Sequence, residues 1–217
     1  MRAAVTGGTA AFLMLGLLAG PGARAAATEG WLEPEEGVFA GYAAPWPTEL
    51  KVRRVLLGDD HYRGCQLVTL PSFGNDKVVF IRDGRPDLEV VSRTIVTQSR
   101  NRSRVDTKTA PLDHDSALEV LETCEAVLVR TRYPPEPTAG LDGIVYHAGH
   151  WAPGTFLAGQ AWSPKPGTIA REFVALEDAL AAYAESPPER RPAAKSALLE
   201  KARALLKRVK AADPRDH

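Results

Sequence analysis

The sequence lacks the common motifs of nucleotide-binding and hydrolytic enzymes. It contains no Gly-x-Ser-x-Gly nucleophile elbow, no glycine-rich phosphate loop and no Gly-x-Gly-x-x-Gly dinucleotide fingerprint. These motifs supply the groups that their chemistry needs, either an exposed nucleophile or backbone N–H groups that hold a phosphate. Their absence argues against these enzyme classes without excluding an enzyme, and we expect no cofactor.

Long hydrophobic runs are also missing, apart from one near the N-terminus. The run Ala10–Gly20 is about eleven residues long, whereas a transmembrane helix needs roughly twenty apolar residues. It follows the positively charged start Met1-Arg2 and precedes the small-x-small sequence Ala23-Arg24-Ala25. The pattern predicts a signal peptide over residues 1–25, cleaved after Ala25. We therefore expect an exported protein, periplasmic or extracellular, with no transmembrane anchor.

Cysteine is scarce, because the chain has only Cys65 and Cys124. In an oxidising compartment an even number of cysteines favours a disulfide. Cys124 lies on the apolar stripe of a predicted helix and Cys65 on a predicted strand, which makes the bond geometrically plausible. It would close a loop of about sixty residues and contribute about 3–4 kcal/mol in the chain-entropy model. The alternative is a pair of buried thiols.

The chain also lacks net charge, since 27 basic residues balance 27 acidic ones. The charges are unevenly spread, because residues 190–210 are strongly basic and the chain before them is acidic. A neutral exported protein without aromatic residues among its basic ones is not expected to bind nucleic acid. The basic C-terminal helix could contact an anionic surface, or it could be a solvated face whose basic end suits the helix dipole.

The mature chain predicts one domain over residues 50–211, with two flanking segments. Residues 26–49 are rich in proline, glycine and glutamate and contain spaced aromatic residues such as Trp31 and Trp46. Proline forbids a continuous helix there, and loose aromatic side chains are costly in water, so we expect an extended arm that docks on the domain. Residues 212–217 are expected to form a disordered tail.

Apolar periodicity predicts the fold class. Strands are expected over residues 50–57, 62–70, 77–82, 88–97, 143–147 and 155–163. Their short connections favour antiparallel pairing, whereas residues 100–115 are polar and predict a loop. Helices are expected after the capping box Ser116-x-x-Glu119, after Thr168, and over residues 193–211. The prediction is an α+β fold, with an antiparallel sheet of about six strands packed against two or three helices.

One histidine pair could hold a metal ion. His147 and His150 are three residues apart, at the end of a predicted strand and in the predicted loop 148–154. That placement does not aim both rings at one point, and a zinc site needs further ligands, so we expect no metal here. The simpler interpretation is the rim of a hairpin with one buried and one exposed histidine.

Acids next to histidine occur twice, in Asp59-Asp60-His61 and Asp113-His114-Asp115. A neighbouring acid can orient a general base and support its pKa. Aspartate is also favoured in turns for backbone reasons, which is the simpler explanation at both places. We therefore assign no catalytic residue.

Several short motifs occur together over residues 125–185. They are Arg132-Tyr133-Pro134, Gly140-Leu141-Asp142-Gly143-x-x-Tyr146-His147 and Gly159-Gln160-x-Trp162-Ser163-Pro164, followed by an amphipathic helix. In combination they resemble a group of exported bacterial proteins of unknown function. The resemblance implies export and a shared fold only.

The same stretch supplies the candidate binding residues. Tyr146, His147, Gln160 and Trp162 could form a groove on the predicted hairpin, and Trp151 could anchor a ligand from its tip. The structural alternative makes Trp162 a core residue. The sequence favours a non-catalytic exported protein that binds another protein or a small ligand. The alternatives are a periplasmic hydrolase that uses a histidine with a nearby acid, and an envelope-associated structural protein.

Overall fold

The computed structural model describes most of the predicted domain. It covers residues 30–34, 55–57, 63–84, 87–99, 102–134, 142–152 and 154–212. The predicted signal peptide with its cleavage site at Ala25, much of the arm, and residues 213–217 lie outside the described residues. Within the described ranges, no helix is long and apolar enough to cross a membrane.

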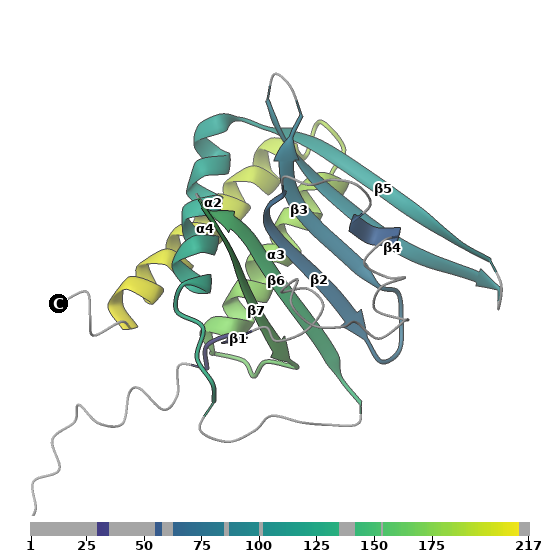
Figure 1. The fold of residues 1–217 in the computed structure, drawn as a ribbon. Helices are drawn as coiled ribbons and strands as arrows, with labels where there is room; N and C mark the ends of the chain where they lie inside the picture. The colour runs from purple at the N-terminus through teal and green to yellow at the C-terminus, as the bar shows by residue number, and fades with distance from the viewer. Residues whose placement is uncertain are drawn as a thin grey trace, which may run out of the picture.

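A seven-stranded antiparallel sheet forms the centre of the described structure (Figure 1). Its strands are β1 (Glu33–Pro34), β2 (Arg63–Pro71), β3 (Lys77–Asp83), β4 (Leu88–Ser99), β5 (Arg102–Leu112), β6 (Ile144–Ala152) and β7 (Thr155–Trp162). They lie in the order β1-β7-β6-β2-β3-β4-β5. The predicted α+β class is confirmed, and the sheet is one strand larger than expected.

Three helices lie on one face of this sheet (Figure 1): α2 (His114–Leu128), α3 (Ile169–Glu185) and α4 (Arg191–Ala212). Helix α2 packs on β2, β6 and β7, α3 packs on β2 to β5, and α4 packs against α2 and α3. The predicted apolar stripes of the last two helices are confirmed as buried. They are Ile169, Phe173, Leu176, Leu180 and Tyr183 on α3, and Leu198, Ala202, Leu205 and Val209 on α4.

Side-chain alternation divides the sheet into a helix-covered face and a helix-free face. The main core lies between the helix-covered face and the helices. A smaller cluster on the helix-free face consists of Val68, Val78, Phe80 and Val91 under Leu56 and Leu57. The guanidinium of Arg93 fixes this cover by donating to the carbonyls of Leu56 and Leu57, at 3.0 and 3.2 Å.

The segment that carries Leu56 and Leu57 differs from its prediction. Residues 50–57 were predicted to form a strand, but residues 55–57 form a helical turn. Residues 50–54 lie outside the described part. The apolar residues that suggested a strand, Leu56 and Leu57, are buried because they cap the smaller cluster.

Strand β5 corrects a second prediction, the polar loop over residues 100–115. Its residues pair with β4 along almost their whole length, from Leu88↔Leu112 to Ser99↔Arg102. Many of its side chains are exposed because β5 is an edge strand, and edge strands carry charges that discourage pairing with other chains. Arg104 and Asp106 form an ion pair there, at 3.1 Å. The polar side chains of this stretch therefore indicate an edge strand of the sheet and not a loop.

Helix α2 begins earlier than the capping box predicted. Asp113 is its N-cap, and its carboxylate accepts the backbone N–H of Ser116 at 3.1 Å and the Ser116 hydroxyl at 2.9 Å. Ser116 therefore lies inside the first turn and is not the cap.

Strand β6 extends beyond the predicted end at His147. It pairs with β7 as far as Ala152↔Thr155, so residues 148–152 are strand and not loop. Gly149 suggested a loop, but a Cβ at this position would lie 2.5 Å from the Phe156 ring and 2.8 Å from Nε2 of Gln66. The glycine makes room for side chains from both neighbouring strands.

The described part of the arm docks on the domain. Leu32 is fully buried, and β1 pairs with β7 through Glu33↔Gln160. The carbonyls of Gly30 and Leu32 accept the N–H groups of Ala170 and Arg132, each at 2.9 Å. Residues 30–34 thereby join β7, the start of α3 and the segment after α2.

Candidate functional site

Four of the five predicted binding residues lie on the helix-free face. On β6 and β7 the register pairs His147 with Gln160, Val145 with Trp162, and Trp151 with Phe156. Directly paired residues point to the same side of a sheet, so His147, Trp151, Gln160 and Trp162 share this face. They are spread along two strands and do not converge on one point.

Tyr146 lies on the opposite face. It pairs with Ala161 and is buried in the main core under the helices, where burial raises the pKa of its hydroxyl. The structure therefore separates Tyr146 from the other four residues. The cause is the alternation of side chains along β6, because adjacent residues of a strand point to opposite faces.

His147 and His150 are also on opposite faces. Both are buried, which corrects the expectation that one of them is exposed. His150 is on the helix-covered face, where its Nδ1 accepts the backbone N–H of Cys65 at 3.2 Å. Burial lowers the pKa of His150, and the nearby charge of Glu125 opposes this shift. His147 and His150 cannot share one metal ion in this arrangement.

The Asp113-His114-Asp115 cluster contributes to helix capping. Besides the first turn of α2, the Asp113 carboxylate accepts a hydrogen bond from Nζ of Lys195 at 2.9 Å. This bond and that from the Ser116 N–H lower the pKa of Asp113 to about 2. His114 is exposed on the first turn of α2. The cluster Asp59-Asp60-His61 lies outside the described residues.

A cavity of about 590 Å³ opens where β1, the end of β7 and the start of α3 meet. We call it the Trp pocket, because Trp31 and Trp162 both line it. The remaining lining residues are Gly30, Glu33, Pro134, Ala161, Ala170 and residues 163–168. Of the five predicted binding residues, Trp162 alone belongs to it.

The backbone around the Trp pocket is held in place by specific contacts. Ser163 has a φ of +41°, which an L-residue rarely adopts. Its N–H donates to the carbonyl of Ile144 at 2.8 Å, and its Oγ accepts the N–H of Ile144 at 3.0 Å. A Cβ on Gly143 would lie 2.6 Å from Nε1 of Trp162, so this glycine is required for the indole to pack there.

The opposite wall of the Trp pocket is held in a similar way. The guanidinium of Arg132 lies 4.6 Å from the ring centre of Trp31, which favours a cation–π contact. Thr168 caps α3 by accepting the N–H of Arg171 at 3.2 Å. Both tryptophans thus belong to walls that are formed before any ligand arrives.

The Trp pocket suits binding better than catalysis. Its volume falls in the range of about 300–1,000 Å³ that is typical of small-molecule sites. Its walls are mostly apolar, and their charged side chains are Glu33 and Lys165. Among the described residues that line the pocket there is no histidine and no cysteine. Sequence analysis missed Lys165 and the role of Trp31, and the signal available was the group of prolines between Trp162 and the cap Thr168.

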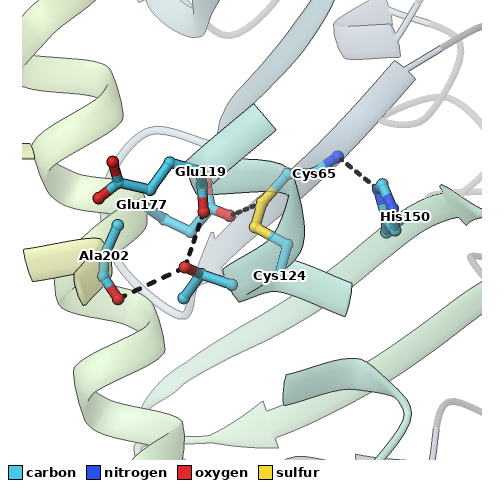
Figure 2. Close-up of a disulfide and its surroundings, with 7 residues drawn as sticks. Cys65, Glu119, Cys124, His150, Glu177 and Ala202 are labelled. Atoms are coloured by element: carbon cyan, nitrogen blue, oxygen red, sulfur yellow. Dashed lines mark hydrogen bonds between the residues drawn. A yellow bond between two sulfur atoms is a disulfide. The ribbon is translucent and has the colours of Figure 1, made fainter. Parts of the chain in front are cut away.

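The disulfide between Cys65 and Cys124 is present (Figure 2), as predicted. It joins β2 to α2, with a distance of 5.8 Å between the two Cα atoms. A register shift between Gly64 and Gln66 makes Cys65 a bulge residue. The bulge turns the Cys65 side chain toward α2, and Gly64 beside it leaves space for Leu121.

The basic helix α4 is largely paired with acids of its own domain. The ion pairs are Lys195–Asp113, Arg203–Glu119, Arg208–Glu172 and Lys210–Glu122. They join α4 to the N-cap and body of α2 and to α3. The uneven charge distribution of the sequence is therefore partly neutralised within the fold.

No protein-family model matches the chain, and no curated protein or solved structure matches it either. The resemblance of residues 125–185 to exported bacterial proteins of unknown function stays a prediction. The functional argument therefore depends on the geometry of this structure.

Proposed function

We propose that this chain is an exported, non-catalytic protein that binds a small ligand in the Trp pocket. The observation that carries the proposal is a preformed cavity of about 590 Å³ between two tryptophans. Indole rings supply a large contact area at low cost in side-chain entropy, so a pocket that presents two of them is suited to binding.

The walls indicate the chemistry of the ligand. The two indoles and the neighbouring prolines favour a mostly apolar molecule with a flat or aliphatic ring. The ammonium group of Lys165 and the hydroxyl of Ser163 would accommodate a carboxylate or another anionic group, whereas the Thr168 hydroxyl already donates to the Lys165 carbonyl at 2.7 Å. We therefore propose a small amphipathic anion as the ligand class.

Export is part of the same proposal. The signal-peptide pattern supports it, and so does the disulfide, because disulfides persist in oxidising compartments. The two alternatives have less support. Neither His147 nor His114 lines the Trp pocket, and the ion pairs of α4 reduce the charge that it could offer to an anionic surface.

A ligand screen tests the proposal. The purified mature protein is screened by thermal shift against aromatic and aliphatic carboxylates, sugars, amino acids and short peptides. Hits from the first two classes should raise the melting temperature, because a ligand that binds only the folded state stabilises it. Trp162→Ala and Lys165→Ala should weaken these hits, whereas the control Trp151→Phe, outside the pocket, should not.

The outcomes separate the hypotheses. Hits that bind Trp162→Ala as well as the original chain would exclude the Trp pocket as their site. Binding that is lost in Trp151→Ala but kept in Trp162→Ala would favour the exposed end of the β6–β7 hairpin instead. Turnover of a hit would contradict the non-catalytic part of the proposal.

A further inference from the structure

A buried carboxyl group lies beside the disulfide. Glu177 on α3 is only 1% exposed, and its Oε1 is 3.1 Å from Sγ of Cys65 (Figure 2). Its Oε2 is buried and has no hydrogen-bond partner in the part of the chain that the structure describes. An unpartnered buried polar atom is costly, and such atoms often mark a redox role or a bound ion.

The disulfide and Glu177 bring together three groups that could ligate a metal ion after the sulfur–sulfur bond is reduced. Sγ of Cys65, Sγ of Cys124 and a carboxylate oxygen of Glu177 all lie within 4.8 Å of one another, and all three residues are buried. They come from β2, α2 and α3, so three elements of the fold meet at this point. We call the three residues the Cys–Glu cluster.

The spacing suits a tetrahedral ion once the sulfur–sulfur bond is broken. Zinc–sulfur bonds of about 2.3 Å and zinc–oxygen bonds of about 2.1 Å place two thiolates roughly 3.8 Å apart and a carboxylate roughly 3.6 Å from each. The observed 3.1 Å from Oε1 to the Cys65 sulfur is shorter than the second value by about 0.5 Å, so the reduced sulfur has to move away from Glu177 to make room for the ion. After reduction the two sulfurs have to move apart to roughly 3.8 Å by rotation of their side chains, with their Cα atoms 5.8 Å apart in this structure.

The backbone at Cys65 adds an independent observation. Cys65 has a φ of +35°, a conformation that a residue with a Cβ adopts only at a cost. The bulge and the hydrogen bond to His150 Nδ1 hold it there. This conformation points the sulfur at α2 and Glu177, and strained backbone of this kind is concentrated at functional sites.

We propose that the Cys–Glu cluster is a redox-gated metal site, which binds a zinc-class divalent ion when the disulfide is reduced. A phosphine reductant takes up the oxygen of one water molecule and leaves two thiols, with its phosphorus oxidised to the phosphine oxide. The metal ion then displaces the two thiol protons and the proton of Glu177. Oε2 of Glu177 or a water molecule fills the fourth position. A small-molecule disulfide, which accepts the two electrons and leaves as two thiolates, re-forms the bond between Cys65 and Cys124, removes two ligands and releases the ion.

Cobalt(II) is the probe for this site, because thiolate-bound cobalt gives an intense near-ultraviolet charge-transfer band and visible bands of tetrahedral geometry. The protein is reduced with a phosphine without oxygen, its fold is checked by circular dichroism, and cobalt is titrated in. We expect binding of one ion per chain, and displacement of cobalt by zinc. The oxidised protein should show no band.

Variants test the assignment. Glu177→Gln should weaken cobalt binding at least about tenfold, because loss of an outer-shell partner alone typically costs that much. The double variant Cys65→Ser/Cys124→Ser should lose the charge-transfer band. Glu119→Gln is the control, since this partly buried acid of α2 pairs with Arg203 of α4 and is not part of the Cys–Glu cluster, and it should bind cobalt like the original chain.

Burial could slow the entry of the ion, so a second sample is reduced, unfolded and refolded with cobalt present. If folded, reduced protein shows no band in either experiment, the proposal is overturned. It is also overturned if Glu177→Gln binds cobalt as tightly as the original chain. Neither result affects the Trp pocket, which lies at the start of α3, whereas Glu177 is in the middle of that helix, and the pocket has its own test.

Discussion

The two faces of the sheet are covered by other elements to different extents. On the helix-covered face, α2 and α3 close a continuous core that includes the disulfide, and the buried Glu177 lies beside it. On the helix-free face the described cover is one helical turn, which places Leu56 and Leu57 over a small cluster. Further along the same face, Trp151 is 52% exposed. One face therefore supplies most of the stability, and the other leaves side chains available to solvent.

The largest expected effect compares two fully buried phenylalanines, one on each face. Phe173 belongs to the main core and Phe80 to the small cluster. Truncation of a buried phenylalanine to alanine costs about 3–5 kcal/mol, and the cost is lower where the site can collapse. Phe173→Ala should therefore lie near the top of this range and Phe80→Ala near the bottom. Urea denaturation measures both, and equal losses would show that the two faces are equally well packed.

Removal of the disulfide should weaken the helix-covered face somewhat less. The double variant Cys65→Ala/Cys124→Ala should lose about 3–4 kcal/mol, because the bond no longer restricts the unfolded chain. A loss of 1 kcal/mol lowers the melting temperature of a domain of this size by about 2–4 °C, so calorimetry should detect a fall of roughly 10 °C. If reduced and oxidised protein melt at the same temperature, the disulfide does not stabilise the fold.

Replacement of Glu177 by glutamine should have a smaller effect, and this effect should be a gain and not a loss of stability. Burial raises the pKa of Glu177 well above its usual value of 4.5, and the charge of Asp178 adds to the shift. Above that usual value the folded state keeps a proton that the unfolded chain has lost. Stability therefore falls as pH rises from 4.5 toward the raised pKa.

The variant Glu177→Gln cannot ionise and should escape this loss. Its stability relative to the original chain should increase between about pH 4 and about pH 7. Denaturation at several pH values measures the difference, with the exposed Glu200→Gln as the control. A difference that does not change with pH would mean that Glu177 is not held as the neutral acid.

The smallest effect is expected at the exposed end of the helix-free face. Trp151 packs on Phe156, with 5.1 Å between their ring centres. Such pairs contribute about 0.5–1.5 kcal/mol, so Trp151→Ala should cost about 1 kcal/mol and Trp151→Phe less. A loss of 3 kcal/mol or more, of the order expected for a buried aromatic residue, would show that this end is closed as tightly as the core.

The helix layer could be predicted from the sequence because of its helical periodicity. Phe173, Leu176 and Leu180 predicted the buried side of α3, and Leu198 to Val209 that of α4, because a packed helix repeats its apolar residues every three or four positions. The edge strand β5 gave no such signal. Its exposed side chains are polar, and its position comes from hydrogen bonds to β4, which sequence patterns do not record.

The candidate sites could be predicted from the sequence only in part. The disulfide could be predicted, because Cys124 is on a helical stripe and Cys65 on a strand. Glu177 was missed, although it lies four residues after Phe173 and three before Leu180, within the buried stripe. An acid at such a position is a usable signal. The Trp pocket could not be predicted, because it depends on how residues 30–34 dock against a turn far along the chain.

The docking of β1 has a consequence for the order of folding. Glu33 pairs with Gln160, and the Gly30 carbonyl accepts the N–H of Ala170, so the first described segment binds to elements that are synthesised much later. This segment therefore stays unpaired until β7 and α3 have been synthesised and folded. Closing such a long loop is slow. We expect β1, the first strand in the described part of the chain, to be the last to join the sheet, and the Trp pocket to be completed only at that step.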